Sequence, residues 1–169
     1  TGYRHDDCQF YMPGFWYRRN LRSPKDAPSF HSSDSWLVRE DRLSAPLTGV
    51  YSEKEKHFVT VSRIDKFAEE ALSTHREGEI ILSGKTSLGF TGFENQDGIT
   101  ALSFGFPYRE APKSYIRKLT LAPAVEAFQF LKKGETVLLT WEIQENKADD
   151  YSDFICHAWE YSYDTYGPK

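Results

Sequence analysis

The sequence lacks most of the motifs that identify a function directly. Its two cysteines, Cys8 and Cys156, lie near opposite ends of the 169-residue chain and form no C-x-x-C pair, which excludes zinc ribbons and thioredoxin-type redox motifs. They either join in a long-range disulfide or stay as two partly buried free thiols, and we expect the second. Glycine-rich phosphate loops and a G-x-S-x-G nucleophile motif are missing as well. No apolar run is long enough to span a bilayer, so no membrane span is predicted.

A basic excess is also lacking. Asp and Glu number 25 against 21 Lys and Arg, and the net charge of −4 argues against nucleic acid as the main partner. The only methionine is Met12 and the chain starts at Thr1, so we expect a processed chain or a domain cut from a longer protein. Aromatic residues, in contrast, are plentiful at 15%, which favours β-sheet packing and suits sugar or base stacking.

From about residue 57 the apolar pattern has a period of two, which predicts antiparallel strands. The expected strands cover residues 57–64, 79–82, 99–106, 115–121, 125–131 and 136–144. In the last of these we expect Val137, Leu139, Trp141 and Ile143 to point inward. Asp97-Gly98 predicts a hairpin turn, and Pro107 and Pro112 are expected to end the strand before them. Short strands at near-regular spacing predict a mainly β fold, an antiparallel β-sandwich.

The two ends of the chain differ from this β pattern. Residues 1–46 are rich in turn residues and aromatics, and we expect an irregular arm pinned across a sheet. A short helix is expected over residues 67–73. At the C-terminus the period becomes 3.6, which predicts an amphipathic helix that Asp149 or Asp150 caps and Gly167-Pro168 ends. Its apolar stripe consists of Tyr151, Phe154, Ile155, Ala158 and Trp159. The expected division is a sandwich domain over 1–148 and a helical linker over 149–169.

The densest charged cluster is Arg39, Glu40, Asp41 and Arg42. Neighbouring arginines and burial can tune two carboxylates for acid–base work, but the same residues also suit a salt-bridged loop. We favour the salt-bridged loop, because adjacent residues on an extended chain point to opposite faces. We expect Asp41 and Arg42 to be held by hydrogen bonds to the backbone or to each other, and Arg39 or Glu40 to face the surface.

Other polar groups carry weaker signals. Trp16, Tyr17 and Arg18, with Arg19 and Arg22 nearby, form a basic patch interleaved with aromatics that suits a domain interface. The run from His5 to Cys8 contains metal-ligand types but not ligand spacing, so no metal or other cofactor is expected. Cys156-His157 is expected to be a packing element, since neighbouring helix residues diverge by about 100°. Neither pattern predicts a catalytic residue.

The order of several motifs resembles the N-terminal β-supersandwich domain of bacterial six-hairpin glycosidase-type proteins. The motifs are Met12 to Tyr17, Trp36 to Pro46, Leu88-Gly89-Phe90, Phe106 to Pro112 and Gly134 to Ile143. The resemblance implies a sandwich similar to the galactose mutarotase-like fold. It also implies a linker helix and a downstream (α/α) toroid that carries the catalytic acids of a periplasmic or secreted glycoside hydrolase. The toroid hairpins are absent from this chain.

These expectations lead to one main function and two alternatives. The main expectation is a non-catalytic accessory domain of a carbohydrate-active protein, partnered by the toroid and by an oligo- or polysaccharide. In that role Arg39 to Arg42 and Trp16 to Arg18 would face the cleft or the domain interface. The first alternative is a free-standing carbohydrate-binding module with exposed Trp or Tyr. The second is a stand-alone sugar epimerase or lyase that uses Glu40, Asp41 and a histidine.

Overall fold

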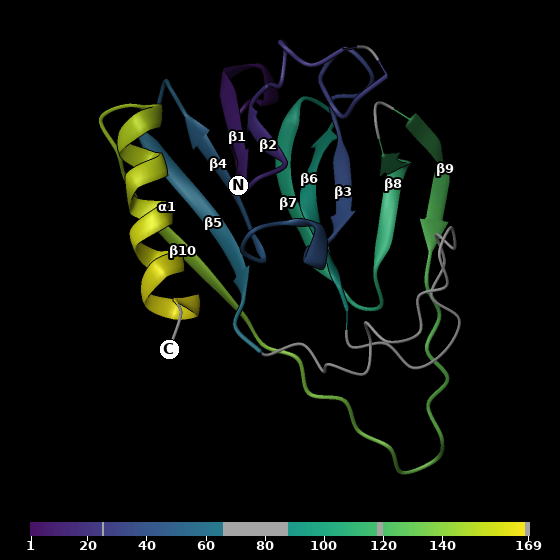
Figure 1. The fold of residues 1–169 in the computed structure, drawn as a ribbon. Coiled ribbons are helices and arrows are strands. Elements are labelled where there is room, and N and C mark those ends of the chain that lie inside the picture. Colours follow the sequence, from purple (N-terminus) through teal and green to yellow (C-terminus); the bar gives the residue numbers. More distant parts are fainter. Residues whose placement is uncertain (25, 66–87, 118–119, 168–169) are drawn as a thin grey trace.

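The computed structural model describes residues 1–24, 26–65, 88–117 and 120–167, and it contains two five-stranded antiparallel sheets and one helix (Figure 1). The first sheet has the strand order β10-β5-β4-β1-β2, which comprises Trp141–Lys147, His57–Arg63, Leu47–Ser52, Cys8–Met12 and Trp16–Arg18. The second has the order β7-β6-β3-β8-β9, which comprises Ile99–Gly105, Phe90–Gln96, Trp36–Arg39, Arg109–Arg117 and Thr120–Glu126. Two single-turn 3₁₀ helices, η1 (His5–Asp7) and η2 (Glu40–Arg42), precede β1 and follow β3. The expected β-sandwich is confirmed.

The apolar core lies between the two sheets and is largely aromatic. The rings of Phe10 and Phe93 stack across the two sheets with centroids 3.9 Å apart, and those of Trp16 and Trp36 lie 6.0 Å apart. The fully or nearly buried members are Cys8, Phe10, Met12, Trp16, Trp36, Val38, Leu43, Val50 and Phe93. Most of them come from the first 50 residues, so the aromatic N-terminal part supplies much of the core.

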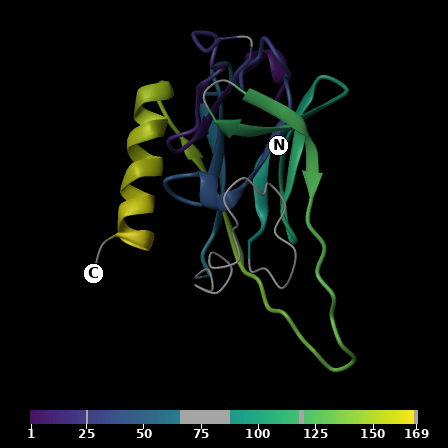
Figure 2. The ribbon, with the colours of Figure 1, turned by 45° about the vertical axis from the view of Figure 1, so that its right-hand side comes forward.

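A third layer covers the outer face of the first sheet. Helix α1 (Tyr151–Tyr166) packs there through Tyr151, Phe154 and Ala158, and Figure 2 shows it on the side away from the second sheet. Asp150 caps the helix, because its side chain accepts hydrogen bonds from the backbone N–H groups of Ser152 and Asp153. The expected helix and its cap are therefore confirmed. The prediction that Trp159 belongs to the buried stripe is wrong, because this side chain is 62% exposed.

Predictions that depend on a few neighbouring residues, such as one strand and one turn, are confirmed. Strand β5 covers nearly all of the expected 57–64, and Asp97 and Gly98 adopt positive φ at the β6–β7 turn. Gly92 lies where the backbone of β6 approaches β3, and a Cβ there would collide with the carbonyl oxygen of Trp36. The expected helix over 67–73 and strand over 79–82 fall outside the described residues.

The irregular arm expected over residues 1–46 is wrong. This region supplies β1, β2 and β3, and β3 is the central strand of the second sheet. The expected strand over 115–121 is also wrong, because Tyr115 and Leu121 are paired partners on β8 and β9. Pro112 lies inside β8 at a register shift, where a missing N–H is tolerated, and so does not end a strand.

The bounds and the register of the strand expected over 136–144 are also wrong. Strand β10 starts only at Trp141, at the edge of the sheet beside β5, and residues 136–140 are irregular. Ile143 is 63% exposed and Val137 is also exposed, so the inward register fails for both side chains. An edge strand needs only one paired side, and apolar alternation along the sequence does not reveal where that pairing begins.

Candidate functional site

The predicted charged residues lie where the chain crosses between the sheets. Strand β3 of the second sheet ends at Arg39, η2 carries Glu40, Asp41 and Arg42, and the chain then enters β4 of the first sheet. The structure adds Arg63 from the end of β5 and Glu110 from the start of β8. These six residues are called the charged cluster below.

Glu40 is the central group of the charged cluster. Its side chain is buried and pairs with the guanidinium of Arg63, and its Oε1 also accepts a hydrogen bond of 2.6 Å from the backbone N–H of Gly89. Its Oε2 has no hydrogen-bond partner in the described part of the chain. Burial raises the pKa of Glu40 above its usual range, against the opposing pull of Arg63. The carboxylate of Glu40 thus links the two sheets, because Gly89 precedes β6 of the second sheet and Arg63 ends β5 of the first.

The remaining charges of the cluster form two further pairs. Arg39 Nε donates to Asp41 Oδ1 at 2.5 Å, and its guanidinium lies 5.3 Å from the ring centre of Tyr108. Arg42 holds the carboxylate of Glu110 with two N–H groups, the Nη2 bond being 3.1 Å long, and Ser114 donates to the same carboxylate. The bidentate geometry fixes Arg42 firmly.

The expected orientations within this cluster are partly wrong. Arg39 and Glu40 are buried rather than facing the surface. Asp41 and Arg42 are held by hydrogen bonds, but their partners are Arg39 and Glu110 rather than the backbone or each other. Each carboxylate of the cluster pairs with a guanidinium, which is the arrangement of a salt-bridged loop that connects the two sheets.

The predicted aromatic and basic patch divides between the core and a groove. Trp16 is fully buried between the sheets and donates from its indole N–H to the carbonyl of Arg18, so it offers no surface to a ligand or partner. This corrects its place among the interface candidates. Tyr17 is 46% exposed, and with Arg18 it lines a groove of about 600 Å³.

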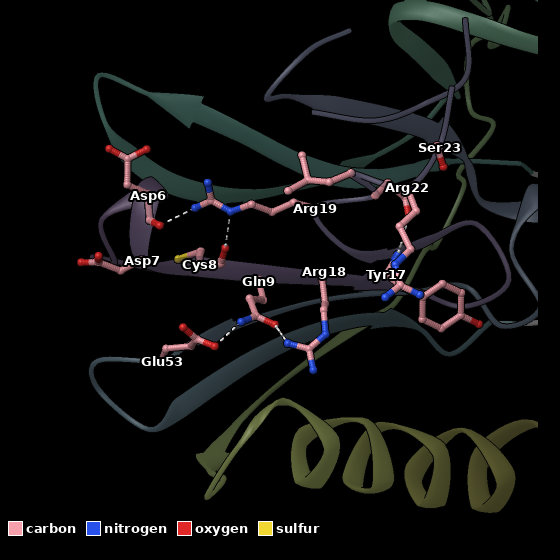
Figure 3. A pocket seen from close by; sticks show the side chains of 12 residues that line it. Asp6, Asp7, Cys8, Gln9, Tyr17, Arg18, Arg19, Arg22, Ser23 and Glu53 are labelled. Atoms are coloured by element: carbon pink, nitrogen blue, oxygen red, sulfur yellow. Dashed lines mark hydrogen bonds between the residues drawn. The ribbon is translucent and has the colours of Figure 1, made fainter. Parts of the chain in front are cut away.

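The groove has an ordered polar lining (Figure 3). Gln9 lies at its centre, where its amide N–H donates to Glu53 and its Oε1 accepts from Arg18 Nη1 at 2.6 Å. Arg18 also lies over the ring of Tyr151, 4.5 Å from its centre. The residues that complete the lining are Asp6, Asp7, Cys8, Tyr17, Arg19, Asn20, Leu21, Arg22 and Ser23. We call it the Tyr17 groove.

The structure does not bring the two predicted groups together. The charged cluster precedes β4 at Arg42, whereas Glu53 of the Tyr17 groove follows the other end of β4. Sequence reasoning missed Arg63, Glu110, Gln9 and Glu53. Only the surplus of charge at 39–42 and the mixed composition at 16–22 pointed to these regions, because the missing partners are distant in sequence.

A third surface is an exposed apolar loop, residues 128–140, which projects beyond the sandwich (Figure 1). Phe128, Phe130 and Leu138 are 72%, 93% and 85% exposed, and Leu131 and Val137 are exposed as well. The strand expected over 125–131 is wrong here, since β9 ends at Glu126. A turn within the loop is closed by the hydrogen bond from Glu135 N to Lys132 O.

The cysteine and metal predictions can be compared with the described residues. Cys8 and Cys156 are free thiols as expected, and Cys8 is buried, but Cys156 is exposed rather than partly buried. Burial raises the pKa of the Cys8 thiol. No group of three or more His, Cys, Asp or Glu side chains is arranged to hold a metal ion among the described residues. Within the same residues, no helix is both long and apolar enough to cross a membrane.

No protein-family model, curated protein or solved structure matches this chain.

Proposed function

We propose that this chain is a non-catalytic accessory domain of a carbohydrate-active protein and that it supports a catalytic domain of the same parent chain. The observation that carries the proposal is the apolar loop. Five large apolar side chains on one short segment are exposed, and surfaces of this kind favour contact with another protein surface. The carbohydrate assignment comes from the resemblance of the motifs at 12–17 and 36–46 to glycosidase-type proteins.

The apolar loop is held in place at both ends. At its start, the N–H of Ala127 donates to the carbonyl of Tyr108 at 2.9 Å. At its end, Thr140 donates to the carboxylate of Asp65 and accepts from the N–H of Ile64. A loop with fixed ends loses less conformational entropy when it docks, which favours binding.

The occupant that we propose is the domain that follows α1 in the parent chain, with the (α/α) toroid as the expected fold. The C-terminal end of α1 lies at the same end of the molecule as the apolar loop in both views (Figures 1 and 2). The hydroxyl of Tyr166 donates to the carbonyl of Arg63 at 2.8 Å, so this end of the helix also lies beside the charged cluster. A following domain would therefore start at the end of the molecule that carries the apolar loop.

We also propose that this chain catalyses no reaction on its own. Burial of Glu40 and the pairing of Asp41 and Glu110 with arginines favour structural roles for these carboxylates. We therefore expect no glycosidase turnover by this chain. Turnover by the purified chain, abolished by Glu40→Gln, would instead support the stand-alone enzyme.

The docking experiment uses the chain and the product of the reading frame downstream of Lys169, expressed separately and mixed. Phe130→Ser and Leu138→Ser together should weaken the complex by about tenfold or more in isothermal titration calorimetry, since each loses burial of a large apolar side chain. Ile143→Ser is the matched control, because Ile143 is 63% exposed but lies on β10 outside the loop. A stop codon after Lys169, or equal binding by all variants, would overturn the proposal.

A further inference from the structure

The Tyr17 groove lies away from the proposed docking end and has a different chemistry. Its central row runs from Glu53 through Gln9 to Arg18, with the ring of Tyr17 beyond, and Figure 3 shows these side chains side by side. An acceptor, an amide and a donor thus follow one another along the wall of an open groove. The volume of about 600 Å³ is that of a typical small-molecule site.

We propose that the Tyr17 groove binds a neutral oligosaccharide. The choice of a saccharide among polyhydroxylated ligands rests on the function proposed above, whereas the preference for a neutral ligand rests on the groove alone. The two can fail separately, because docking depends on the apolar loop and saccharide binding on the groove.

The polar row matches the hydrogen-bonding needs of sugar hydroxyl groups. Each hydroxyl donates one hydrogen bond and accepts others, so neighbouring hydroxyls are best satisfied by alternating acceptors and donors. Glu53 offers carboxylate acceptors, and Arg18 carries more N–H donors than its single bond to Gln9 uses. The bonds through Gln9 hold both groups in place before a ligand arrives, which lowers the entropy cost of binding.

Tyr17 supplies the apolar contact that a sugar ring needs. A pyranose has a face of C–H groups that can lie flat on an aromatic ring, and the Tyr17 ring is nearly half exposed beside the polar row. The ring packs against that of its cross-strand neighbour Tyr11, with centroids 5.5 Å apart. Its hydroxyl accepts a hydrogen bond from the N–H of Gly14 at 3.3 Å, which also restrains it.

The charge balance of the groove favours a neutral ligand over an anion. Three arginines, Arg18, Arg19 and Arg22, and three acidic residues, Asp6, Asp7 and Glu53, line the groove. Arg19 is already engaged by backbone carbonyl groups, including a bond of 3.1 Å from Nη2 to the carbonyl of His5. The positive and negative charges of the lining balance each other, so the groove exerts little long-range electrostatic attraction on a phosphate or an acidic polysaccharide.

The test measures binding of soluble neutral oligosaccharides of four to six units by isothermal titration calorimetry. The panel contains gluco-, xylo-, manno- and galacto-configured oligomers, a uronic-acid oligomer and a basic peptide. At least one neutral oligomer should bind to the wild-type chain. Tyr17→Ala and Glu53→Gln should each weaken it by about tenfold or more, because each removes an aromatic contact or a charge-assisted hydrogen bond.

Two matched controls keep the test specific. Tyr163→Ala removes another exposed tyrosine, and Glu55→Gln neutralises a glutamate two residues from Glu53 that does not line the groove. Both should keep the wild-type affinity. Glu53→Gln preserves the size of the side chain, so it tests the groove even if Tyr17→Ala fails to fold.

Three results would overturn this inference. They are no binding by any neutral oligomer, binding by the uronic-acid oligomer or the peptide alone, and equal loss of affinity in the control variants. If the docking experiment succeeds while the neutral oligomers fail, the groove inference falls and the accessory-domain proposal stands. If neutral oligomers bind as expected but the docking experiment fails, the accessory-domain proposal falls and the groove remains a saccharide site.

Discussion

His5 illustrates how a single buried polar side chain depends on this fold. Its ring packs among Phe10, Phe30 and Phe93, and its Nδ1 lies 2.9 Å from Thr100 Oγ1 on β7. Its Nε2 is buried with no hydrogen-bond partner in the described part of the chain. A proton added at Nε2 would place an uncompensated charge among aromatic rings, and burial accordingly lowers the pKa of His5 below its usual value.

This lowered pKa predicts a pH dependence of stability. Below about pH 6.5 the unfolded chain binds a proton at residue 5 that the folded chain resists, so folding becomes less favourable as the pH falls. We expect the free energy of unfolding by urea to decrease between pH 7 and pH 5. The decrease should be smaller in His5→Gln than in the wild-type chain. Identical slopes for both proteins would contradict the assignment.

Helix α1 is the element whose start the sequence predicted best. Asp150 Oδ1 accepts from the N–H groups of Ser152 at 2.7 Å and Asp153 at 2.9 Å. These bonds satisfy two of the four N–H groups that a helix leaves free, and they hold the pKa of Asp150 below its usual range. Asp149, one residue earlier, has the same charge but does not cap the helix.

The pair therefore gives a matched test of the cap. Asp150→Ala should lower the free energy of unfolding measurably more than Asp149→Ala does, because only Asp150 accepts hydrogen bonds from the first N–H groups of the helix. Urea titration followed by circular dichroism measures both. Equal effects would show that the loss of charge, and not of the cap, determines the stability.

The elements that sequence reasoning predicted are those fixed by nearby residues. The cap of α1 and the turn at Asp97-Gly98 depend on contacts within a few positions. Strands β1 to β3 were missed because they have only three to five residues and lie between turns. Apart from the short β1–β2 hairpin, their pairing partners lie tens of residues away. Short apolar runs between Pro and Gly are also typical of loops.

The same distinction applies to the sites. The sequence located Arg39 to Arg42 and the Tyr17 region because their unusual residues are adjacent. It did not reveal that Glu40 pairs with Arg63, 23 positions away, or that Gln9 joins Glu53, 44 positions away. Charged residues such as Arg63 on an alternating strand are common, and only the folded chain shows which of them become buried.

The whole molecule combines three layers through two separate apolar clusters. One cluster lies between the sheets, and the other lies between the first sheet and α1, where Phe154 contacts Tyr11, Tyr51 and Phe58. Strands β1, β4 and β5 each place side chains in or against both clusters, on the two faces of the first sheet. The helix and the second sheet therefore pack on opposite faces of the same sheet. We expect the three layers to unfold as one cooperative unit.

Phe154→Ala tests this cooperativity. It should lower the free energy of unfolding by about 3–5 kcal/mol, because it opens a cavity under the helix. Trp159→Ala removes a larger side chain that is mostly exposed, so it should lower the free energy of unfolding much less than Phe154→Ala does.

Helical circular dichroism and tryptophan fluorescence should give the same unfolding midpoint in each of these proteins. Loss of the helical signal at lower urea than the fluorescence change would show that α1 is a loosely attached linker.

The charged cluster closes one end of the sandwich, and the opposite end is closed as well. There the backbone of Tyr3 to His5, just before β1, bonds to Gly98 and Thr100 of the second sheet, through contacts of 2.8 and 2.9 Å. Together with the Glu40 bonds to Arg63 and Gly89, these contacts tie the two sheets to each other at both ends. Bonds at both ends resist separation of the sheets, so we expect the amide protons next to the aromatic core to exchange with solvent mainly through unfolding of the whole domain.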